Sequence, residues 1–428
     1  MKYKTFSKPS LIVKSIKRDP NKITVSFLPS RKIQSYFNKE NTFVAEYTCN
    51  IEDVPISCAV IPFVVNILPI VWLTDATLYV DAIDKSFFES IESFKQGYMD
   101  MYPDISFKGE INTTHIIDNT YPASDEVGIL FSGGVDAFST LLMHYNENPM
   151  PITIIGADIK LDDIEGINNL KEQTSKSLYD LSLKKPCFIK TNFRSFINEG
   201  KLDALVKNSK DGWWHGFQHG IGIIGLSAPI AYTRRHAILY IASSYTKNDH
   251  VTCASHPSID NNIRLGSTVT RHDQYENSRQ DKIGIITEFH RRTSKVINLR
   301  VCWESRGAKN CCRCEKCLRT IYALYAEGEK PTNYGFDYTI PQLTHSSMNF
   351  RKNIPYLQDM QRVFWIDIQN RFKETQQYSD CQEINWIYNI DFSKRASKSM
   401  RLLLILKKIF WWTKSIFLHL LKRLSVET

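Results

Sequence analysis

The alternation of short apolar runs with helical segments between residues 127 and 243 constrains the fold more than any other feature. Runs of this kind, without polar alternation, are typical of strands buried on both faces of a sheet. The expected strands are 127–131, 152–157, 187–191 and 237–243, and the expected helices are 137–145, 164–181 and 221–231. Strands that alternate with helices build a parallel sheet. We therefore predict an α/β fold with a doubly wound parallel sheet.

We expect four parts along the chain, each with its own sequence character. An N-terminal α+β domain comes first, followed by the doubly wound domain, a helical extension and a basic amphipathic C-terminal helix. In that order they span residues 1–120, 124–330, 331–398 and 399–428. A chain of 428 residues is long enough for two or three domains that each bury a core.

One apolar run lies inside the first part, from residue 60 to residue 73. It is too short to span a membrane. It is also interrupted by Pro62 and Pro69, which disfavour a helix interior. We predict one or two buried strands in this run.

The first candidate site is the glycine turn between the strand 127–131 and the helix that follows. Two glycines let backbone N–H groups face an anion, and the helix adds its positive end. Ser132 adds a hydroxyl, and Asp136, negative in an anion site, is expected to hold Mg²⁺ on the phosphates of ATP. A glycine turn without a ligand is the alternative. The predicted ATP-binding residues are Phe131, Ser132, Gly133, Gly134, Val135, Asp136, Ala137, Phe138 and Ser139.

The second candidate site is a cysteine cluster near residue 310. Five of the 10 cysteines fall within residues 302–317, and clustering of this kind indicates a metal rather than a disulfide framework. Four thiolates in the spacing C-x8-C-x2-C-x2-C suit tetrahedral Zn²⁺, with an iron–sulfur cluster as the competing use. The predicted zinc ligands are Cys302, Cys311, Cys314 and Cys317, with Cys312 as a non-ligand.

The two motifs together resemble known enzymes. Ser-Gly-Gly-Val-Asp at 132–136 resembles the phosphate loop of the PP-loop N-type ATP pyrophosphatases, with Ala137 in place of the usual second serine. The cysteine spacing, with Trp303 after the first cysteine and Leu-Arg after the last, resembles the zinc segment of the 7-cyano-7-deazaguanine synthase family. The resemblance covers about residues 126–325 and implies an adenine nucleotide alpha-hydrolase-like fold.

Further candidate residues lie between the two motifs. Arg279 occupies the place of a phosphate-facing lysine of that family and is expected to clamp pyrophosphate, and His272 is a candidate for proton transfer. The family's substrate segments are replaced by other sequences, so its substrate is not carried over. The residues that we expect to contact the substrate are Trp214, His215, His219 and Asp273. His215 and His219 also have a metal-like spacing, and core packing is the plain alternative.

The basic balance and the chain ends suggest where the protein works. The N-terminus has no apolar leader, so we expect a cytoplasmic protein. Basic and apolar residues of 401–424 separate onto two sides of a helix, which favours an anionic membrane surface on the inner face over a packing helix. A net charge of +9 leaves nucleic acid open as a partner, although we do not expect it.

The resemblance implies an ATP-dependent ligase. ATP would adenylate a small-molecule or protein-linked carboxylate with release of pyrophosphate, and an amine or ammonia would then displace AMP. Relatives act in anti-phage systems, and other PP-loop enzymes amidate surface sugars; we also expect a homo-oligomer. Two alternatives stay open. One is tRNA sulfur transfer through the thiol of Cys187 or Cys253, and the other is a non-catalytic nucleotide-binding scaffold, which Ala137 would allow.

Overall fold

The computed structural model describes residues 8–397, 399 and 400, which form two compact units. The first unit contains the described residues up to Cys311 together with Glu329–Asp337, and the second contains Cys312–Gly328 and the described residues from Tyr338 onward. The predicted amphipathic helix at 401–424 lies outside the described residues. Within the described residues, no helix is both long enough and apolar enough to cross a membrane.

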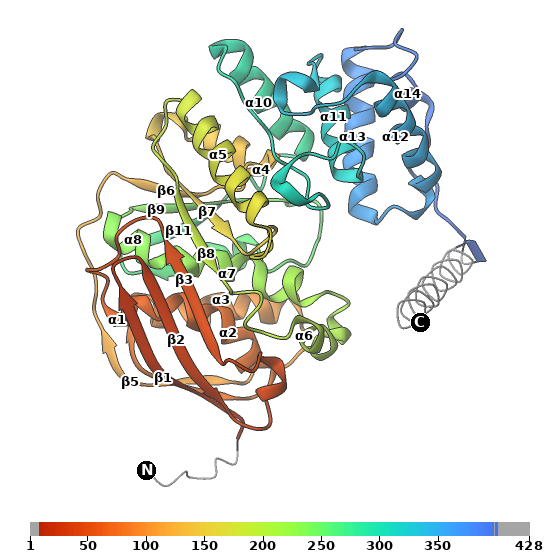
Figure 1. Cartoon of the computed structure of the whole chain (residues 1–428). Helices are drawn as coiled ribbons and strands as arrows, with labels where there is room; N and C mark the ends of the chain where they lie inside the picture. The colour runs from red at the N-terminus through yellow and green to blue at the C-terminus, as the bar shows by residue number, and fades with distance from the viewer. Residues whose placement is uncertain (1–7, 398, 401–428) are drawn as a thin grey trace, which may run out of the picture. The chain divides into compact units, whose positions relative to one another are not determined.

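The first unit is built on one mixed, mostly parallel sheet, as expected for an α/β protein (Figure 1). Its strand order is β10-β11-β9-β6-β7-β8-β3-β2-β1-β4-β5. The strands are β1 (Ser10–Asp19), β2 (Lys22–Pro29), β3 (Thr42–Tyr47), β4 (Thr77–Asp84), β5 (Glu110–Ile117), β6 (Val127–Leu130), β7 (Met150–Ile155), β8 (Cys187–Thr191), β9 (Ile238–Ala242), β10 (Arg264–Leu265) and β11 (Thr268–Asp273).

Five neighbouring strands, β11-β9-β6-β7-β8, are parallel and form a doubly wound core. Counted in chain order within this core, their arrangement reverses direction between β6 and β9. Ligands of such sheets bind outside the carboxyl ends of the strands at this point of reversal. The predicted phosphate loop directly follows β6, so the fold puts it at the position where a ligand is expected.

The helices of the first unit lie on both faces of the sheet. They are α1 (Ile56–Ala59), α2 (Ile61–Leu73), α3 (Lys85–Met101), α4 (Val135–Met143), α5 (Ile164–Asp180), α6 (Glu199–Leu205), α7 (His219–Leu226), α8 (Ala228–Arg234), α9 (Pro257–Asp260) and α10 (Arg279–Thr293). One layer joins α2 to α7 and α3 to α9, whereas α4 packs on α10 in the other (Figure 1).

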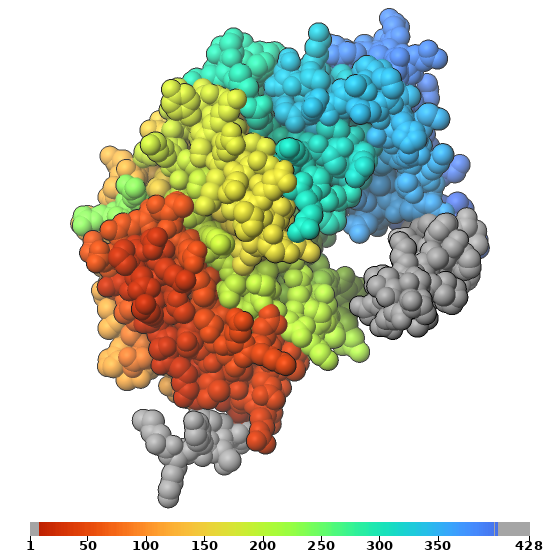
Figure 2. Space-filling view, viewed as in Figure 1, coloured from red at the N-terminus to blue at the C-terminus, as the bar shows by residue number. Residues whose placement is uncertain are grey.

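The N-terminal residues do not form a sheet of their own, which differs from the expected domain at 1–120. The antiparallel pair β3–β8 joins β1–β5 to the doubly wound core, with Tyr47 opposite Ile189. In the space-filling view, the red N-terminal segment and the yellow segment that contains α5 adjoin without a break (Figure 2). The mixture of strands and helices expected of this segment is present, for example as β2, β4 and α3. Periodicity predicts such elements but not which strands pair across the chain.

The apolar run at 60–73 is a helix, α2, and the prediction of buried strands there was wrong. Nearly every residue of α2 is buried, and a helix that is apolar all round shows no periodicity. Pro62 lies in the first turn, where a missing N–H costs nothing. The one polar residue, Asn66, donates to the carbonyl of Pro62 at 2.9 Å and accepts from Nε2 of Gln218 at 2.9 Å.

The second unit is helical, as predicted for the C-terminal extension, but it begins earlier in the chain. It contains α11 (Glu315–Ala326), α12 (Ile340–Asn353), α13 (Asp359–Thr375) and α14 (Trp386–Asn389). An aromatic core holds it together, in which Trp365 stacks on Phe350 at 4.5 Å and on Phe392 at 5.5 Å between ring centroids. Arg362 donates to four backbone carbonyls, including that of Ile354, and ties residues 392–394 to α13.

Candidate nucleotide and metal sites

The loop between β6 and α4 has the backbone that an anion site needs. Gly133 adopts φ +77°, in the left-handed region that favours glycine. Gly134 is the N-cap of α4, and its N–H donates to Oγ of Ser132 at 3.3 Å. The positive end of α4 therefore meets the loop at the carboxyl edge of the sheet.

Most of the predicted ATP-binding side chains point into the core. Phe131 packs edge-on against Phe138 with ring centroids 4.9 Å apart, and the hydroxyl of Ser139 donates to Oε1 of Gln274 at 2.7 Å. The buried members of the set are Phe131, Gly133, Val135, Ala137, Phe138 and Ser139. Only Ser132, Gly134 and Asp136 are exposed or half-buried, so a ligand can reach the loop through these residues.

Asp136 is engaged by two cationic side chains of α10. Nη2 of Arg279 lies 2.8 Å from Oδ2 of Asp136, and Nζ of Lys282 lies 3.7 Å from Oδ1. Lys282 is 1% exposed, and its ammonium also donates to the carbonyl of Ser243 at 2.7 Å. Burial lowers the pKa of Lys282, and the Asp136 carboxylate opposes that shift.

These ion pairs give Asp136 partners that the sequence did not predict. Asp136 was expected to hold Mg²⁺ on the phosphates, because a carboxylate next to phosphates requires a cation between them. Arg279 and Lys282 supply that cation from the protein itself. Sequence reasoning found Arg279 but missed Lys282, which lies one helical turn further on the same face of α10.

A third cationic residue lies against the loop. Nη2 of Arg300 donates to the carbonyl of Ser132 at 2.8 Å, and its backbone N–H donates to the carbonyl of Gly133 at 2.7 Å. Sequence reasoning missed Arg300 as well, because nothing in its neighbourhood marks it as close to residue 132. Three cationic groups therefore meet at a loop that already presents a helix N-terminus.

Asp273, predicted as a substrate contact, belongs to the loop region. It ends β11, and its Oδ1 lies 3.3 Å from Nε2 of His144, whose Nδ1 lies 2.6 Å from Glu147. Burial lowers the pKa of His144, but the two carboxylates raise it overall. The carbonyl of Asp273 accepts from the N–H of Ser243, so β11 and β9 end together beside Lys282.

His272, predicted to move protons, faces the other side of β11 because successive side chains of a strand alternate. Its side chain is 1% exposed, and Nδ1 lies 2.8 Å from Oδ2 of the buried Asp260. Its ring also packs edge-on against Tyr275 at 5.6 Å. The contacts of His272 are therefore with Asp260 and Tyr275 instead of with the ion pairs around Asp136.

The aromatic and histidine segment forms a π-helix, Trp214–Gln218, that runs directly into α7. The glycines in this segment allow close packing. A Cβ on Gly216 would lie 2.6 Å from the hydroxyl of Tyr102, and one on Gly220 would lie 2.3 Å from the carbonyl of Ala254. Segments with π-helical geometry are frequent at functional sites.

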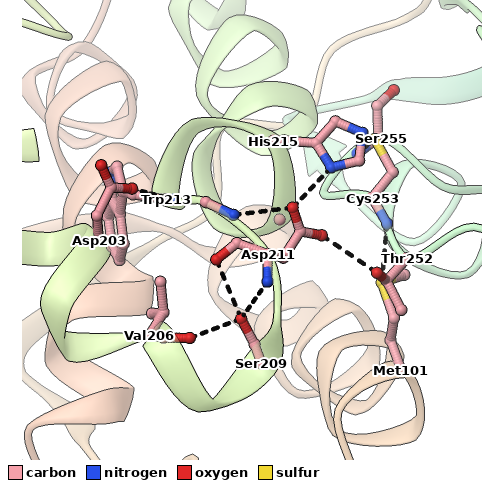
Figure 3. A network of polar contacts seen from close by, with 12 residues as sticks. Met101, Asp203, Val206, Ser209, Asp211, Trp213, His215, Thr252, Cys253 and Ser255 are labelled. Atoms are coloured by element: carbon pink, nitrogen blue, oxygen red, sulfur yellow. Dashed lines mark hydrogen bonds and ion pairs between the residues drawn. The ribbon is translucent and has the colours of Figure 1, made fainter. Parts of the chain in front are cut away.

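The three side chains predicted for substrate in this segment have different surroundings. The guanidinium of Arg194 covers the ring of Trp214 at 4.3 Å, and His219 packs edge-on against that ring at 4.9 Å. His215 is 40% exposed and lies 2.8 Å from Asp211 through Nδ1 (Figure 3). In the described part of the chain, no metal-binding group includes His215 and His219.

The four predicted zinc ligands come together. The sulfur atoms of Cys302, Cys311, Cys314 and Cys317 lie within 4.8 Å of one another. Four thiolates at this spacing fit a tetrahedral S₄ site for a metal such as zinc. Asn310 supports the cluster, because its Oδ1 accepts from the N–H groups of Val301 and Cys302, and its Nδ2 donates to the carbonyl of Leu299 at 2.8 Å.

Cys187, one of the two thiols considered for sulfur transfer, lies at the opposite end of the parallel strands from the phosphate loop. It begins β8, whereas the phosphate loop follows the end of the parallel strand β6. Its sulfur lies 2.7 Å from that of Cys49, which follows β3. The other thiol, Cys253, lies in the connection after β9, at the same edge as the loop.

Comparison with family models, with characterised proteins and with solved structures found no significant match. The assignment of a function therefore depends on the residues and the geometry described above.

Proposed function

We propose that this protein is an ATP-dependent, adenylate-forming ligase of the PP-loop class, similar to 7-cyano-7-deazaguanine synthase. The observation that carries the proposal is the meeting of Arg279, Lys282 and Arg300 at the loop after β6. This loop lies where the strand order reverses, next to the N-terminus of α4. Cationic groups and oriented N–H groups at such a place are suited to a triphosphate.

Each group then has a task in the transfer of AMP. The N–H groups at 133 and 134 and the end of α4 receive the phosphates. A substrate carboxylate oxygen attacks the α phosphorus, and the bond to the β-phosphate oxygen breaks. The cationic side chains stabilise the charge that develops on the departing pyrophosphate. Asp136 keeps Arg279 and Lys282 in position before ATP arrives.

The two metals have different places in this proposal. The four-thiolate site has no open coordination position, so zinc would stabilise the fold and take no part in the chemistry. Mg²⁺ prefers several oxygen ligands, and no metal-binding group found in the described part of the chain contains Asp136. We therefore assign Mg²⁺ to the ATP that enters and not to a resident site.

The wider setting follows the same reasoning. A reducing cytoplasm would keep the four cysteines available as thiolates. The acceptor would be a small-molecule or protein-linked carboxylate, in anti-phage deazaguanine chemistry or surface-glycan amidation, with an amine or ammonia as the nitrogen donor.

Exchange of labelled pyrophosphate into ATP tests the proposal. The full-length protein is incubated with ATP, Mg²⁺, labelled pyrophosphate and a metabolite extract. Adenylate formation is reversible, so label should enter ATP only when the extract is present. ATP that stays unlabelled while ADP accumulates would indicate a kinase or ATPase and would overturn the proposal.

A further inference from the structure

A second group of reactive side chains lies in the connection between β9 and β11. The thiol of Cys253 lies beside the imidazole of His215 (Figure 3). Its sulfur accepts from the N–H of Ser255 at 3.4 Å, and its own N–H donates to Sδ of Met101 at 3.2 Å. The backbone on both sides is fixed too, since the N–H of Ala254 donates to the carbonyl of His215 at 2.8 Å.

The imidazole beside this thiol is held in one orientation. Nδ1 of His215 lies 2.8 Å from Oδ1 of Asp211, and Nε2 lies 3.1 Å from the hydroxyl of Tyr245. Asp211 is itself fixed, because Oδ2 accepts from the hydroxyls of Tyr102 at 3.0 Å and Thr252 at 3.1 Å. A thiol, an imidazole and an orienting carboxylate form the arrangement of a cysteine nucleophile.

The charges of this group also suit a nucleophile. The hydrogen bond to Asp211 raises the pKa of His215 to about 11, so its ring is cationic at neutral pH. Burial raises the pKa of Cys253, but His215 and His219 outweigh it and lower the value to about 6. Tyr98 of α3 and Tyr102, the residue after α3, also lie near the thiol. Cys58 shows the opposite case, since burial and Asp84 raise its pKa.

The connection after β9 links the surroundings of the thiol to the proposed nucleotide site. Ser243 and Ser244 accept hydrogen bonds from Lys282 and Arg279, and Tyr245 contacts His215. Three consecutive residues span at most about 7 Å between their outer Cα atoms. The connection after β9 therefore contacts the cations of the loop at one end and the imidazole beside Cys253 at the other.

We propose that Cys253 is an acyl carrier, and this inference rests on the proposed adenylation. The Cys253 thiolate attacks the acyl carbon of the acyl adenylate; the C–S bond forms, the C–O bond to AMP breaks, and AMP leaves with the electron pair. The amine then attacks the thioester carbon; the C–N bond forms, the C–S bond breaks, and the thiolate is restored. The proton lost by nitrogen passes to water.

Alkylation by iodoacetamide tests the nucleophile without ATP. The full-length protein is treated between pH 5 and pH 8, and each cysteine is followed by peptide mass spectrometry. Cys381 is the control, because it is more exposed but has a raised pKa. We expect Cys253 to react at least about 10-fold faster than Cys381 at pH 6.5. Asp211→Asn should slow only Cys253. Equal or slower alkylation of Cys253 would overturn the proposal.

Acid quenching after incubation with ATP, Mg²⁺ and a metabolite extract tests the acyl transfer. The peptide that contains Cys253 should gain an ATP-dependent mass that hydroxylamine removes. Cys253→Ala should release about one pyrophosphate per chain and keep AMP bound as the acyl adenylate, whereas Cys253→Ser should release at most about one AMP per chain, because a stable acyl ester forms. Steady AMP release by both variants, with no adduct in the wild type, would overturn the acyl carrier and leave the adenylation intact.

Two other outcomes would also decide the question. A mass gain of one sulfur atom on Cys253 would replace acyl transfer by sulfur transfer. No pyrophosphate exchange at all would defeat the proposed function and the acyl transfer with it. The alkylation result would still stand, because it needs no nucleotide, so the two failures can be told apart.

Discussion

The cysteine cluster and the phosphate loop each bring like charges close together. The charges of the cluster come from one short segment, whereas those at the loop come from residues far apart in the sequence. The four sulfurs come from residues 302–317, and a bound metal ion such as zinc would offset their mutual repulsion as thiolates. Asp136 meets Arg279 from 143 positions away, and Ser132 meets Arg300 from 168 positions away. The first site is a local motif that could hold a metal, whereas the second is assembled by the fold from its own cations.

Removing one cysteine of the cluster should have the largest effect on stability. Cys314→Ser removes one thiolate, and a structural zinc site contributes about 10 kcal/mol or more to folding. We expect the wild type to carry about one zinc per chain and the variant to lose it, with a large fall in thermal stability.

Elemental analysis and thermal unfolding measure both effects. Cys312→Ser is the matched control, because Cys312 neighbours the cluster but is not one of its four sulfurs. A folded wild type without metal, or equal metal loss in both variants, would contradict the assignment.

Loss of a distant cation should disable the loop but leave the fold intact. Lys282→Met removes one ammonium beside Asp136, and we expect AMP formation to fall by roughly 100- to 1,000-fold. Lys247→Met is the control, since Lys247 is exposed and pairs with Glu276. Steady-state assays with matched circular dichroism would test this, and equal activity of the two variants would remove Lys282 from the site.

The burial of Lys282 also predicts that AMP formation declines at alkaline pH. Burial lowers the pKa of Lys282, so its charge is lost at a lower pH than the charge of an ordinary lysine as the pH rises. AMP formation by the wild type should therefore decline on the alkaline side before an ordinary lysine titrates. Lys282→Arg keeps its charge throughout, so its residual activity should show a flatter alkaline limb.

A smaller effect should come from the acid sensitivity of the buried His236. Burial lowers the pKa of His236 to about 4, from about 6.5 in the unfolded chain. The unfolded state then binds more protons between these values. The stability that this group contributes is full above pH 6.5 and declines as the pH falls to about 4, by roughly 3 kcal/mol.

Urea unfolding at pH 7 and pH 5 measures this difference. His236→Asn should lose that part of the pH dependence, whereas His345→Asn, on an exposed helix face, should keep it. Acid also protonates the cluster thiolates, so zinc content must be followed in parallel. If His236→Asn is as acid-sensitive as the wild type, the sensitivity belongs to the cluster alone.

The same contrast explains what the sequence could predict. The core strands, the loop after β6 and the cysteine set depend on local patterns and were found. The pairing of β3 with β8 and the approach of Lys282 and Arg300 to the loop depend on how distant segments meet, and no local pattern records this. Helix α2 was missed for a different reason, because full burial removes the periodicity that marks a helix.

We propose that the loop after β6 forms an adenylate. Neutralising one carboxylate at the loop and one away from it tests this most directly. Asp136→Asn removes the charge that positions Arg279 and Lys282, whereas Asp281→Asn makes the same change at the cap of α10. Each protein is incubated with ATP, Mg²⁺ and a metabolite extract, and the nucleotides are resolved. We expect AMP and pyrophosphate from the wild type and Asp281→Asn, and roughly 100-fold less from Asp136→Asn. ADP as the sole product, or equal AMP from all three proteins, would contradict the account.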